Sequence, residues 1–460
     1  MKLSNLKKQL KEKLLIENKR NLNRIKKEYK DRKKDNEEKE IKIIGITGSR
    51  GKTTTAYIVH EYLKQLGYKS VLYSSAKIDS PTTRINPNEA CEVSFDSEES
   101  LLAILEEAES YNADYLVLEV NESTLARGIV KDIPFTVRAL TNLNPTHNME
   151  QYTKEEYVAL KKSFFENISN EEKCTCVIGV QDYDKTLYEE LLALNDKKKL
   201  TFTSNYIAKV KNLDLTKVDV LLEELESSLD GLKLRVKIGK KLYDFTTSLK
   251  GQYNALNLVD AITILKALEV FDNSKFNETV KTLLVPGRME VYKENGRIVV
   301  IDPNLSSVLE FLKKLKQNHQ INKIKVVVGS LGTGFKNWND SFKTTRFLSS
   351  IKPMRQYAME LLKENVDFVY LTENDNAKED VLEICLELQE YLEGKVPSKI
   401  VVDRSLAIKE ALEEAGEGDV IFISGRGNRR ILCNSESTMK LLKDSEIVEQ
   451  VLKDLKAKRK

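Results

Sequence analysis

One short stretch of the chain, GITGSRGKTTT at residues 45–55, limits the possible folds more than any other. An apolar run, IKIIGIT, leads into it, and a helical pattern, AYIVHEYLKQLG, follows it. A glycine-rich turn between a buried strand and a helix directs backbone N–H groups and the positive end of the helix dipole at a phosphate. A glycine-rich turn with a surface lysine is the alternative, but the strand before it and the helix after it favour a phosphate site.

The side chains in this stretch are those that hold a nucleoside triphosphate. Lys52 can reach the β- and γ-phosphates, and the hydroxyl of Thr53 can bind Mg²⁺. The stretch therefore predicts that the protein binds ATP and Mg²⁺. We expect the phosphates to contact Gly48, Ser49, Gly51, Lys52, Thr53 and Thr54.

Strand and helix patterns alternate along most of the chain, which predicts the α/β fold class. Apolar strand patterns lie at 41–47, 69–75, 114–120, 135–143 and 175–180 in the first half, and at 297–303, 323–330, 367–373, 398–403 and 419–425 in the second. Residues 231–248 predict a β-hairpin, and VPGRME at 285–290 predicts a linker. We expect a P-loop central domain with a parallel sheet, residues 41–285, and a C-terminal Rossmann-like doubly wound domain, residues 286–460.

Charge is distributed unevenly, because residues 1–40 hold 15 Lys and Arg against 8 Asp and Glu. This segment predicts a charged helical arm. The arm is either a solvated helix laid on the body of the protein or a contact for RNA or anionic lipid. The formal net charge of the whole chain is only +3, so composition gives no reason to expect a nucleic-acid partner.

Cysteine usage and hydropathy predict a soluble, cytoplasmic protein. The 5 cysteines are scattered without a C-x-x-C pair, which indicates neither a disulfide framework nor a zinc site. The first residues lack the apolar core of a signal peptide. No apolar run reaches the roughly 20 residues that cross a bilayer.

The phosphate loop departs from the standard P-loop pattern. It reads T-G-S-x-G-K-T-T from Thr47 to Thr54, with Ile46 where the standard loop has its first glycine. This variant resembles the Mur ligase family, whose members join a carboxylate to an amine at the expense of ATP. The resemblance covers residues 41–435. It implies an ATP-dependent acid–amino acid ligase that forms an acyl phosphate and releases ADP and phosphate.

Three further segments resemble the metal and acyl-phosphate motifs of that family. LEVNESTLARG is similar to E-V-S-S-H-x-L, which assigns Glu119 to Mg²⁺, with capping of the next turn as the alternative; Ser123 replaces the motif's histidine. His147 matches a histidine that binds a second Mg²⁺, although it could also be an ordinary core histidine. Lys161 matches a lysine that many members carry as a carbamate, and an unmodified lysine is the alternative. The implied catalytic residues are Lys52, Glu119, His147 and Lys161, and the implied metal site comprises Thr53, Glu119, His147 and Lys161.

The resemblance also implies contacts to the rest of the nucleotide. Asn254 and Asn257, in GQYNALN, would lie near the adenine, although Asn254 could also cap a helix. Arg288, in VPGRME, would reach the ATP phosphates or the hinge. Asp302, in VIDP, would bind the ribose.

Substrate contacts are implied at three loops. Thr82 and Thr83 lie where the family contacts its carboxylate substrate. The loops that select the amine correspond to residues Asp375, Asn376, Lys378, Arg426 and Arg429. Loss of the arginine of the family's D-N-P-R motif argues against a meso-diaminopimelate pocket, and the two arginines would suit a more acidic amine. The segment 331–350, with the only tryptophan of the chain, could be a lid or a partner surface.

The motifs are most similar to the muramoyl-tripeptide synthase branch, but only 40 charged residues precede the phosphate loop region. The peptidoglycan members of the family begin with a domain that binds a UDP-sugar, which we therefore do not expect here. A ligase of the same superfamily that acts on a non-nucleotide acid, such as a glutamate polymer, is one alternative. A non-catalytic ATP-binding scaffold is another, which the joint presence of the implied catalytic residues disfavours. A P-loop kinase or GTPase is disfavoured because no N-K-x-D motif is present.

Overall fold

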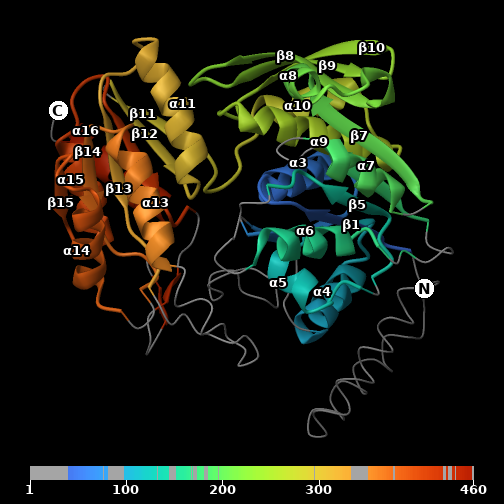
Figure 1. The fold of residues 1–460 in the computed structure, drawn as a ribbon, viewed down its shortest axis with the longest axis horizontal. Coiled ribbons are helices and arrows are strands. Elements are labelled where there is room, and N and C mark those ends of the chain that lie inside the picture. Colours follow the sequence, from blue (N-terminus) through green and yellow to red (C-terminus); the bar gives the residue numbers. More distant parts are fainter. Residues whose placement is uncertain are drawn as a thin grey trace, which may run out of the picture.

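The computed structural model describes residues 40–75, 77–80, 98–131, 133–144, 152–166, 168, 173–180, 185–194, 196–294, 296–332, 351–376, 379–427, 431–433, 438–440 and 442–457. The arm expected at 1–40 therefore lies almost wholly outside the described residues and stays a prediction. The described chain forms two α/β units, one coloured blue to yellow-green and one gold to red in Figure 1. The domain boundary near residue 285 also stays a prediction.

The first unit, described here as the central unit, is built on one sheet. Within the described residues this sheet has ten strands in the order β10-β9-β8-β7-β6-β5-β1-β4-β2-β3. The strands are β1 (Lys42–Thr47), β2 (Ser70–Tyr73), β3 (Ile78–Asp79), β4 (Tyr115–Glu119), β5 (Val137–Leu140), β6 (Thr175–Gly179), β7 (Lys198–Ser204), β8 (Val220–Ser227), β9 (Leu232–Ile238) and β10 (Lys241–Thr247). The five strands predicted from apolar runs are all present, and β9 and β10 form the predicted hairpin.

Helices cover both faces of this sheet because its parallel strands are buried on both sides. Successive residues of β1 point to opposite faces. Ile44 and Ile46 join the core under one set of helices, and Ile43 joins the other core. The first set is α3 (Lys52–Gln65), α9 (Tyr253–Ala267) and α10 (Asn273–Lys281), and the second is α4 (Glu98–Ser110), α5 (Glu122–Ala126), α6 (Lys154–Ser163) and α7 (Lys185–Ala193). A further short helix, α8 (Asn205–Lys211), follows β7.

The second unit, the C-terminal unit, is the doubly wound fold that the sequence predicted. Its six described strands have the order β11-β12-β16-β13-β14-β15, and all neighbours are parallel except β11 and β12. They are β11 (Glu290–Glu294), β12 (Arg297–Asp302), β13 (Ile324–Val328), β14 (Phe368–Leu371), β15 (Ser398–Ile400) and β16 (Val420–Ser424). One core lies under α11 (Leu305–Gln317), α13 (Ile351–Lys363) and α14 (Val381–Tyr391), and the opposite core under α15 (Arg404–Glu413) and α16 (Asp444–Ala457). A small ribbon of β17 (Ile431–Cys433) and β18 (Thr438–Lys440) completes the unit.

The arrangement of the sheet determines where a ligand can bind. β1 lies between β4 and β5, and the three strands run parallel. Ligands of such sheets bind at the carboxyl ends of the strands, where neighbouring connections leave to opposite faces. In this chain α3 follows β1 on one face, and α5 follows β4 on the other. None of the described helices combines the length and apolar character needed to cross a bilayer.

One buried carboxyl of the central core leads to a stability prediction. Asp260, on α9, is fully buried, and neither of its oxygens has a hydrogen-bond partner among the described residues. Burial raises the pKa of this carboxyl well above its ordinary value, and the nearby Thr55 hydroxyl offsets this effect only in part. Because the folded pKa is raised, the native state holds a proton that the unfolded state has lost. The contribution of Asp260 to the free energy of unfolding therefore falls as pH rises above about 4.

We expect Asp260→Asn to stabilise the protein at pH 7 by about 1–2 kcal/mol, because an amide is never charged. The gain should shrink as pH is lowered toward 4. Thermal unfolding of both proteins between pH 4 and 8 measures this difference. Asp272→Asn is the matched control, since Asp272 is exposed at the N-cap of α10 and asparagine caps equally well. A gain at Asp260 that is the same at every pH would contradict the prediction.

Candidate active site

The phosphate loop joins β1 to α3, and two of its glycines adopt backbone angles that other residues rarely take. Gly48 has φ 147° and Gly51, at the N-cap of α3, has φ 83°. A Cβ at Gly48 would lie 2.0 Å from the hydroxyl oxygen of Thr141. The first turn of α3 contains no acidic residue, so its N–H groups and dipole are available to an anion.

The end of β5 holds the loop in this conformation. The backbone N–H of Ser49 donates to the carbonyl oxygen of Asn142 at 3.1 Å, and that of Arg50 donates to the Asn142 side chain at 3.1 Å. Lys52 folds back over the loop, and its Nζ donates to the carbonyl oxygen of Gly48 at 2.9 Å. The loop is therefore preorganised, and its ammonium group lies beside the backbone that would surround a phosphate.

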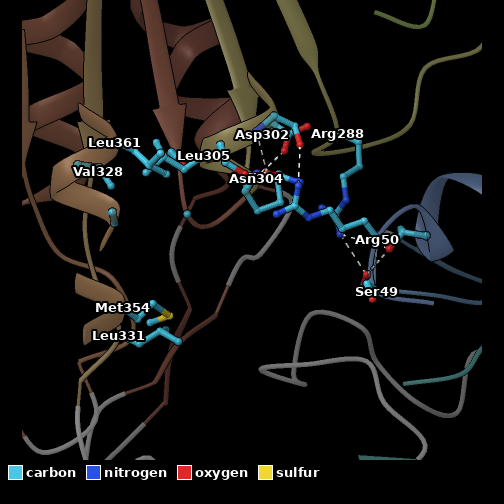
Figure 2. Close-up of a pocket in the computed structure, with 18 of the residues that line it drawn as sticks. Ser49, Arg50, Arg288, Asp302, Asn304, Leu305, Val328, Leu331, Met354 and Leu361 are labelled. Atoms are coloured by element: carbon cyan, nitrogen blue, oxygen red, sulfur yellow. Dashed lines mark hydrogen bonds between the residues drawn. The ribbon is translucent and has the colours of Figure 1, made fainter. Parts of the chain in front are cut away.

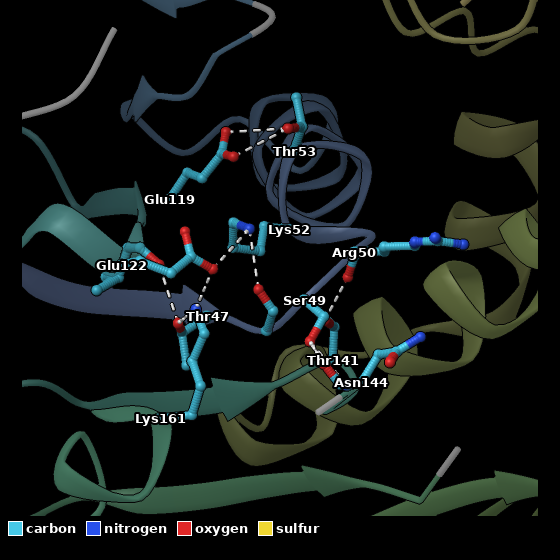
Figure 3. Close-up of polar contacts among 12 residues, drawn as sticks. Thr47, Ser49, Arg50, Lys52, Thr53, Glu119, Glu122, Thr141, Asn144 and Lys161 are labelled. Atoms are coloured by element: carbon cyan, nitrogen blue, oxygen red, sulfur yellow. Dashed lines mark hydrogen bonds and ion pairs between the residues drawn. The ribbon is translucent and has the colours of Figure 1, made fainter. Parts of the chain in front are cut away.

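Thr53 and Glu119 come together as predicted oxygen donors. The Thr53 hydroxyl lies 3.0 and 3.1 Å from the two Glu119 oxygens, at the carboxyl end of β4 (Figure 3). The backbone N–H of Ser75 donates to the same carboxylate at 2.7 Å. A hydroxyl and a carboxylate at this distance are the ligand types that Mg²⁺ accepts beside nucleotide phosphates. These two residues therefore fit a magnesium ion.

Lys161 is buried at the centre of a polar cluster. Its side chain is fully buried on α6, and its Nζ lies 2.7 Å from Oε1 of Glu122 and 3.0 Å from the Thr47 hydroxyl (Figure 3). The same Glu122 oxygen lies 3.8 Å from the Nζ of Lys52 and accepts a hydrogen bond from the Tyr157 hydroxyl at 3.2 Å. One carboxylate oxygen thus joins the phosphate loop to α6.

The electrostatics of this cluster follow from its burial. Burial lowers the pKa of Lys161 to about 8, against the opposing effect of Glu122. Burial alone would raise the pKa of the Glu122 carboxyl, but the two ammonium groups of Lys52 and Lys161 lower it overall. Glu122 therefore stays a carboxylate at neutral pH.

Glu122 is the site residue that sequence reasoning missed. It lies in the first turn of α5, three positions after Glu119, in the motif LEVNESTLARG. The family pattern E-V-S-S-H-x-L directs attention to the histidine position, Ser123, and away from the serine position that Glu122 occupies. An acid replacing a serine inside a metal motif was the available signal.

The hinge residues come together at the other end of the loop. Arg288 lies 3.4 Å from the Thr53 hydroxyl and 3.2 Å from that of Ser75. Asp302 is fully buried and accepts hydrogen bonds from the backbone of Met289 at 2.9 Å and the Tyr253 hydroxyl at 3.2 Å. Burial raises the pKa of Asp302, against the opposing effect of Arg288.

The predicted adenine residues lie on α9 beside the loop. The side chain of Asn257 donates to that of Asn254 at 2.8 Å, and Asn254 donates to the carbonyl oxygen of Lys250 at 2.7 Å. Asn257 also packs against Gly51, where an added Cβ would lie 2.2 Å from its Oδ1. Asn257 lines the cavity described next, whereas Asn254 is a buried support for it.

A cavity of about 660 Å³ lies between the two units. The phosphate loop and Glu119 line its central side, and Arg288 lies where the two units meet. The C-terminal side combines polar residues such as Asp302 and Asn304 with an apolar set (Figure 2). The labelled members of that set are Leu305, Val328, Leu331, Met354 and Leu361. A hydrogen bond from the Arg50 guanidinium to the Ser307 hydroxyl at 3.2 Å connects the two sides. Such a volume is typical of a site for a ligand of nucleotide size.

The described residues that were predicted to select the amine do not line the cavity, unlike the residues of the phosphate loop. Asp375 and Arg426 form a buried ion pair at 3.1 Å, so each neutralises the other. The side chain of Asn376 donates to the carbonyl oxygen of Glu379 at 2.6 Å. None of these three lines the cavity, although their neighbours Asn374 and Gly425 do. The predicted residues Thr82, Thr83, His147, Lys378 and Arg429, and most of the segment 331–350, lie outside the described residues.

A second cluster of metal-ligating types lies at the far end of α3. His60, Glu61 and Asp79 approach one another closely enough to share an ion. However, Lys64 and Lys77 each place an ammonium 2.8 Å from the same Asp79 oxygen, which His60 also contacts at 3.0 Å. These cations satisfy the carboxylate, so the cluster stabilises the packing of α3 on β3.

Comparison with known proteins identifies the family. The model of the Mur ligase middle domain matches residues 46–265, and that of the Mur ligase, glutamate ligase domain matches residues 287–427. The chain is 24% identical over 430 residues to a UDP-N-acetylmuramyl-tripeptide synthetase of Bifidobacterium longum, covering 90% of this chain and 77% of the relative. It is 26% identical over 432 residues to a UDP-N-acetylmuramoyl-L-alanyl-D-glutamate–2,6-diaminopimelate ligase of Caldanaerobacter subterraneus, covering 91% and 79%.

Solved structures share the fold. A UDP-N-acetylmuramoyl-L-alanyl-D-glutamate–2,6-diaminopimelate ligase superposes with a TM-score of 0.57 at 21% identity, covering 91% of this chain and 79% of that one. E. coli FolC, in complex with DHPP and ADP, superposes with a TM-score of 0.61 at 15% identity, covering 91% and 89%. The resemblance seen in the phosphate loop is thus confirmed across both units. The chain belongs to the Mur ligase family of ATP-dependent acid–amino acid ligases.

Proposed function

We propose that this protein uses ATP to activate a substrate carboxylate as an acyl phosphate and then joins it to the amine of an amino acid. One observation carries the proposal: Lys52, Thr53 and Glu119 converge at the phosphate loop, where it opens into a cavity shared with the C-terminal unit. A nucleotide bound there has its terminal phosphate within reach of substrates held by either unit.

The chemistry requires positioning and charge stabilisation rather than a protein nucleophile. A carboxylate oxygen of the acid attacks the γ-phosphorus of ATP, and ADP leaves. The amine nitrogen then attacks the acyl carbon, phosphate leaves, and the nitrogen loses a proton. Lys52 and the N–H groups of the loop stabilise the negative charge of the transferred phosphoryl group.

Thr53 and Glu119 would hold Mg²⁺, with His147 as the predicted ligand of a second ion. The ion, when bound, neutralises the phosphate oxygens during transfer. Arg288 would follow the phosphates as the hinge closes, since it lies 3.4 Å from the Thr53 hydroxyl. Asn257 would contact the adenine. Asp302 would accept hydrogen bonds from the ribose, because its carboxylate has lone pairs that its present partners do not use.

Lys161 has two chemical states that suit such a site. As a carbamate, which the family resemblance implies, it would be an anion beside the metal. As an ammonium it would be a second cation behind Lys52, which its contact with Glu122 at 2.7 Å supports.

The first candidate for the acid is a muramoyl peptide, because relatives across nine tenths of the chain carry that name. A second candidate is a non-nucleotide acid such as a glutamate polymer. Residues 375–378 read D-N-A-K where the diaminopimelate-adding motif is D-N-P-R, so an amine other than diaminopimelate is favoured. Both reactions consume ATP, which fits the predicted cytoplasmic location.

Phosphate release from ATP tests the proposal. With Mg²⁺ present, amino acids are screened singly, with a UDP-muramoyl dipeptide or with short glutamate peptides. We expect release only when an acid and an amine are both present, and an amide product in equal amount by mass spectrometry. Tight ATP binding without release for any pair in the panel would favour the non-catalytic scaffold. Release without amide would indicate an ATPase.

A further inference from the structure

We propose that Glu122 supplies, from the chain itself, the buried carboxylate of the active site, and that Lys161 works beside it as an uncarbamylated ammonium. The inference rests on the proposed ligase function. It concerns the chemical state of one residue of that site and adds Glu122 as a positioning residue for both lysines.

The contacts of Lys161 are those of an ammonium group. Its Nζ lies 2.7 Å from the Glu122 carboxylate and 3.0 Å from the Thr47 hydroxyl oxygen. A protonated lysine offers three donors and no acceptor, so both oxygens can accept from it. Because the side chain is fully buried, an ammonium here needs such a counterion.

One oxygen of Glu122 also contacts Lys52 and Tyr157. Oε1 lies 3.8 Å from the Nζ of Lys52 and accepts from the Tyr157 hydroxyl at 3.2 Å, and the Tyr157 oxygen lies 2.9 Å from the Ser49 hydroxyl, from which it can accept. The carboxylate thus fixes the phosphate-loop lysine and, through Tyr157, the loop backbone around Ser49. An anion at the tip of the lysine side chain is what a carbamate would otherwise provide.

The charge balance of the site also favours the ammonium. The Glu122 carboxylate lies 2.7 Å from the Nζ of Lys161 and 3.8 Å from that of Lys52, so it lies between two cations. A carbamate on Lys161 would replace the nearer cation with an anion. Two anions would then be buried side by side, which is costly without a counterion between them.

Secondary structure positions Glu122, because it lies in the first turn of a helix that directly follows a strand. β4 ends at Glu119 and α5 begins at Glu122, and the two carboxylates diverge (Figure 3). Glu119 faces Thr53, and Glu122 faces Lys161 and Lys52. The pattern E-V-S-S-H-x-L has a serine at this position, so the second carboxylate is a departure from that pattern.

The first experiment reads the state of Lys161 without any turnover. The full-length protein is equilibrated with ¹³C-bicarbonate, and carbamate carbonyl signals are recorded by ¹³C NMR for the wild type, Lys161→Arg and Lys162→Arg. Lys162, which pairs with Glu190 on the surface, is the matched control. A carbamate on Lys161 would give a signal that is present in the wild type and in Lys162→Arg and absent in Lys161→Arg. We expect no such signal. A signal with that behaviour would overturn the inference.

The second experiment removes the carboxylate. Glu122→Ser restores the residue of the family pattern, and Glu122→Gln keeps the shape if the serine variant does not fold. We expect phosphate release to fall on the order of 100-fold in bicarbonate-free buffer. We also expect a new carbamate signal that a second substitution, Lys161→Arg, abolishes, and recovery of at least about tenfold in rate when bicarbonate is added. A folded Glu122 variant that binds ATP but gains neither label nor rescue would overturn the inference.

These outcomes separate the inference from the proposed function. The NMR result depends only on the chemistry of one lysine and stands even if no substrate pair gives phosphate release. Conversely, a carbamylated wild-type Lys161 would leave the ligase proposal intact and remove only the role assigned to Glu122.

Discussion

Lys52→Ala is expected to lower ATP-dependent phosphate release on the order of 1,000-fold or more while the protein stays folded. The Lys52 ammonium lies over the phosphate loop, 2.9 Å from the carbonyl oxygen of Gly48. There it can stabilise the negative charge on the phosphoryl group that is transferred. Its loss leaves Glu122 paired with Lys161, so that buried carboxylate keeps a cation. The fold should therefore lose little stability.

The measurement is the rate of phosphate release with saturating ATP, together with Tm and the affinity for ADP. Lys64→Ala is the matched control, because Lys64 lies on the same helix with 41% of its side chain exposed. We expect that variant to keep wild-type turnover, because Lys64 does not line the cavity that the phosphate loop opens into. Turnover within tenfold of wild type in Lys52→Ala would contradict the assigned role of the loop.

Much of the fold could be predicted because its elements carry strong local patterns. β1, β4 and β16 are short apolar runs, and α3 follows a glycine whose positive φ suits a loop-to-helix junction. Two strands gave weaker signals. β8 is buried only in its first three residues and then alternates half-buried and exposed residues. β11 is nowhere fully buried. Each pairs antiparallel with a neighbour near one end of its sheet.

The site was predictable where a motif is continuous and not where it depends on tertiary contact. Gly51, Lys52 and Thr53 are adjacent, and the structure places them as the loop pattern indicates. The approach of Glu122 to Lys161 joins α5 to α6, and no local pattern reports it. Asp375 and Arg426, predicted to select the amine, are paired with each other in the interior, a neutralisation that sequence spacing cannot reveal.

Gly51→Ala is expected to weaken ADP binding at least about tenfold and to destabilise the protein by about 2–5 kcal/mol. Part of the cost is the backbone, because an alanine at φ 83° is disfavoured by about 1–2 kcal/mol. The rest is a clash, because the new Cβ would lie 2.2 Å from Oδ1 of Asn257 and overpacking costs about 1–3 kcal/mol. Relief of the clash requires the loop or α9 to move, and either movement displaces the N–H groups that face the phosphates.

Gly67→Ala separates the two contributions. Gly67 follows the same helix at φ 87°, and a Cβ there would meet nothing within 4 Å, so this variant should show the backbone cost alone and bind ADP normally. Adding Asn257→Ala to Gly51→Ala should return part of the lost stability, because the two substitutions share one contact and cannot be additive. Denaturant unfolding and ADP titration of these three variants, and of Asn257→Ala alone, measure both effects. Equal losses at Gly51 and Gly67 would show that backbone strain, rather than contact with α9, determines the glycine at the phosphate loop.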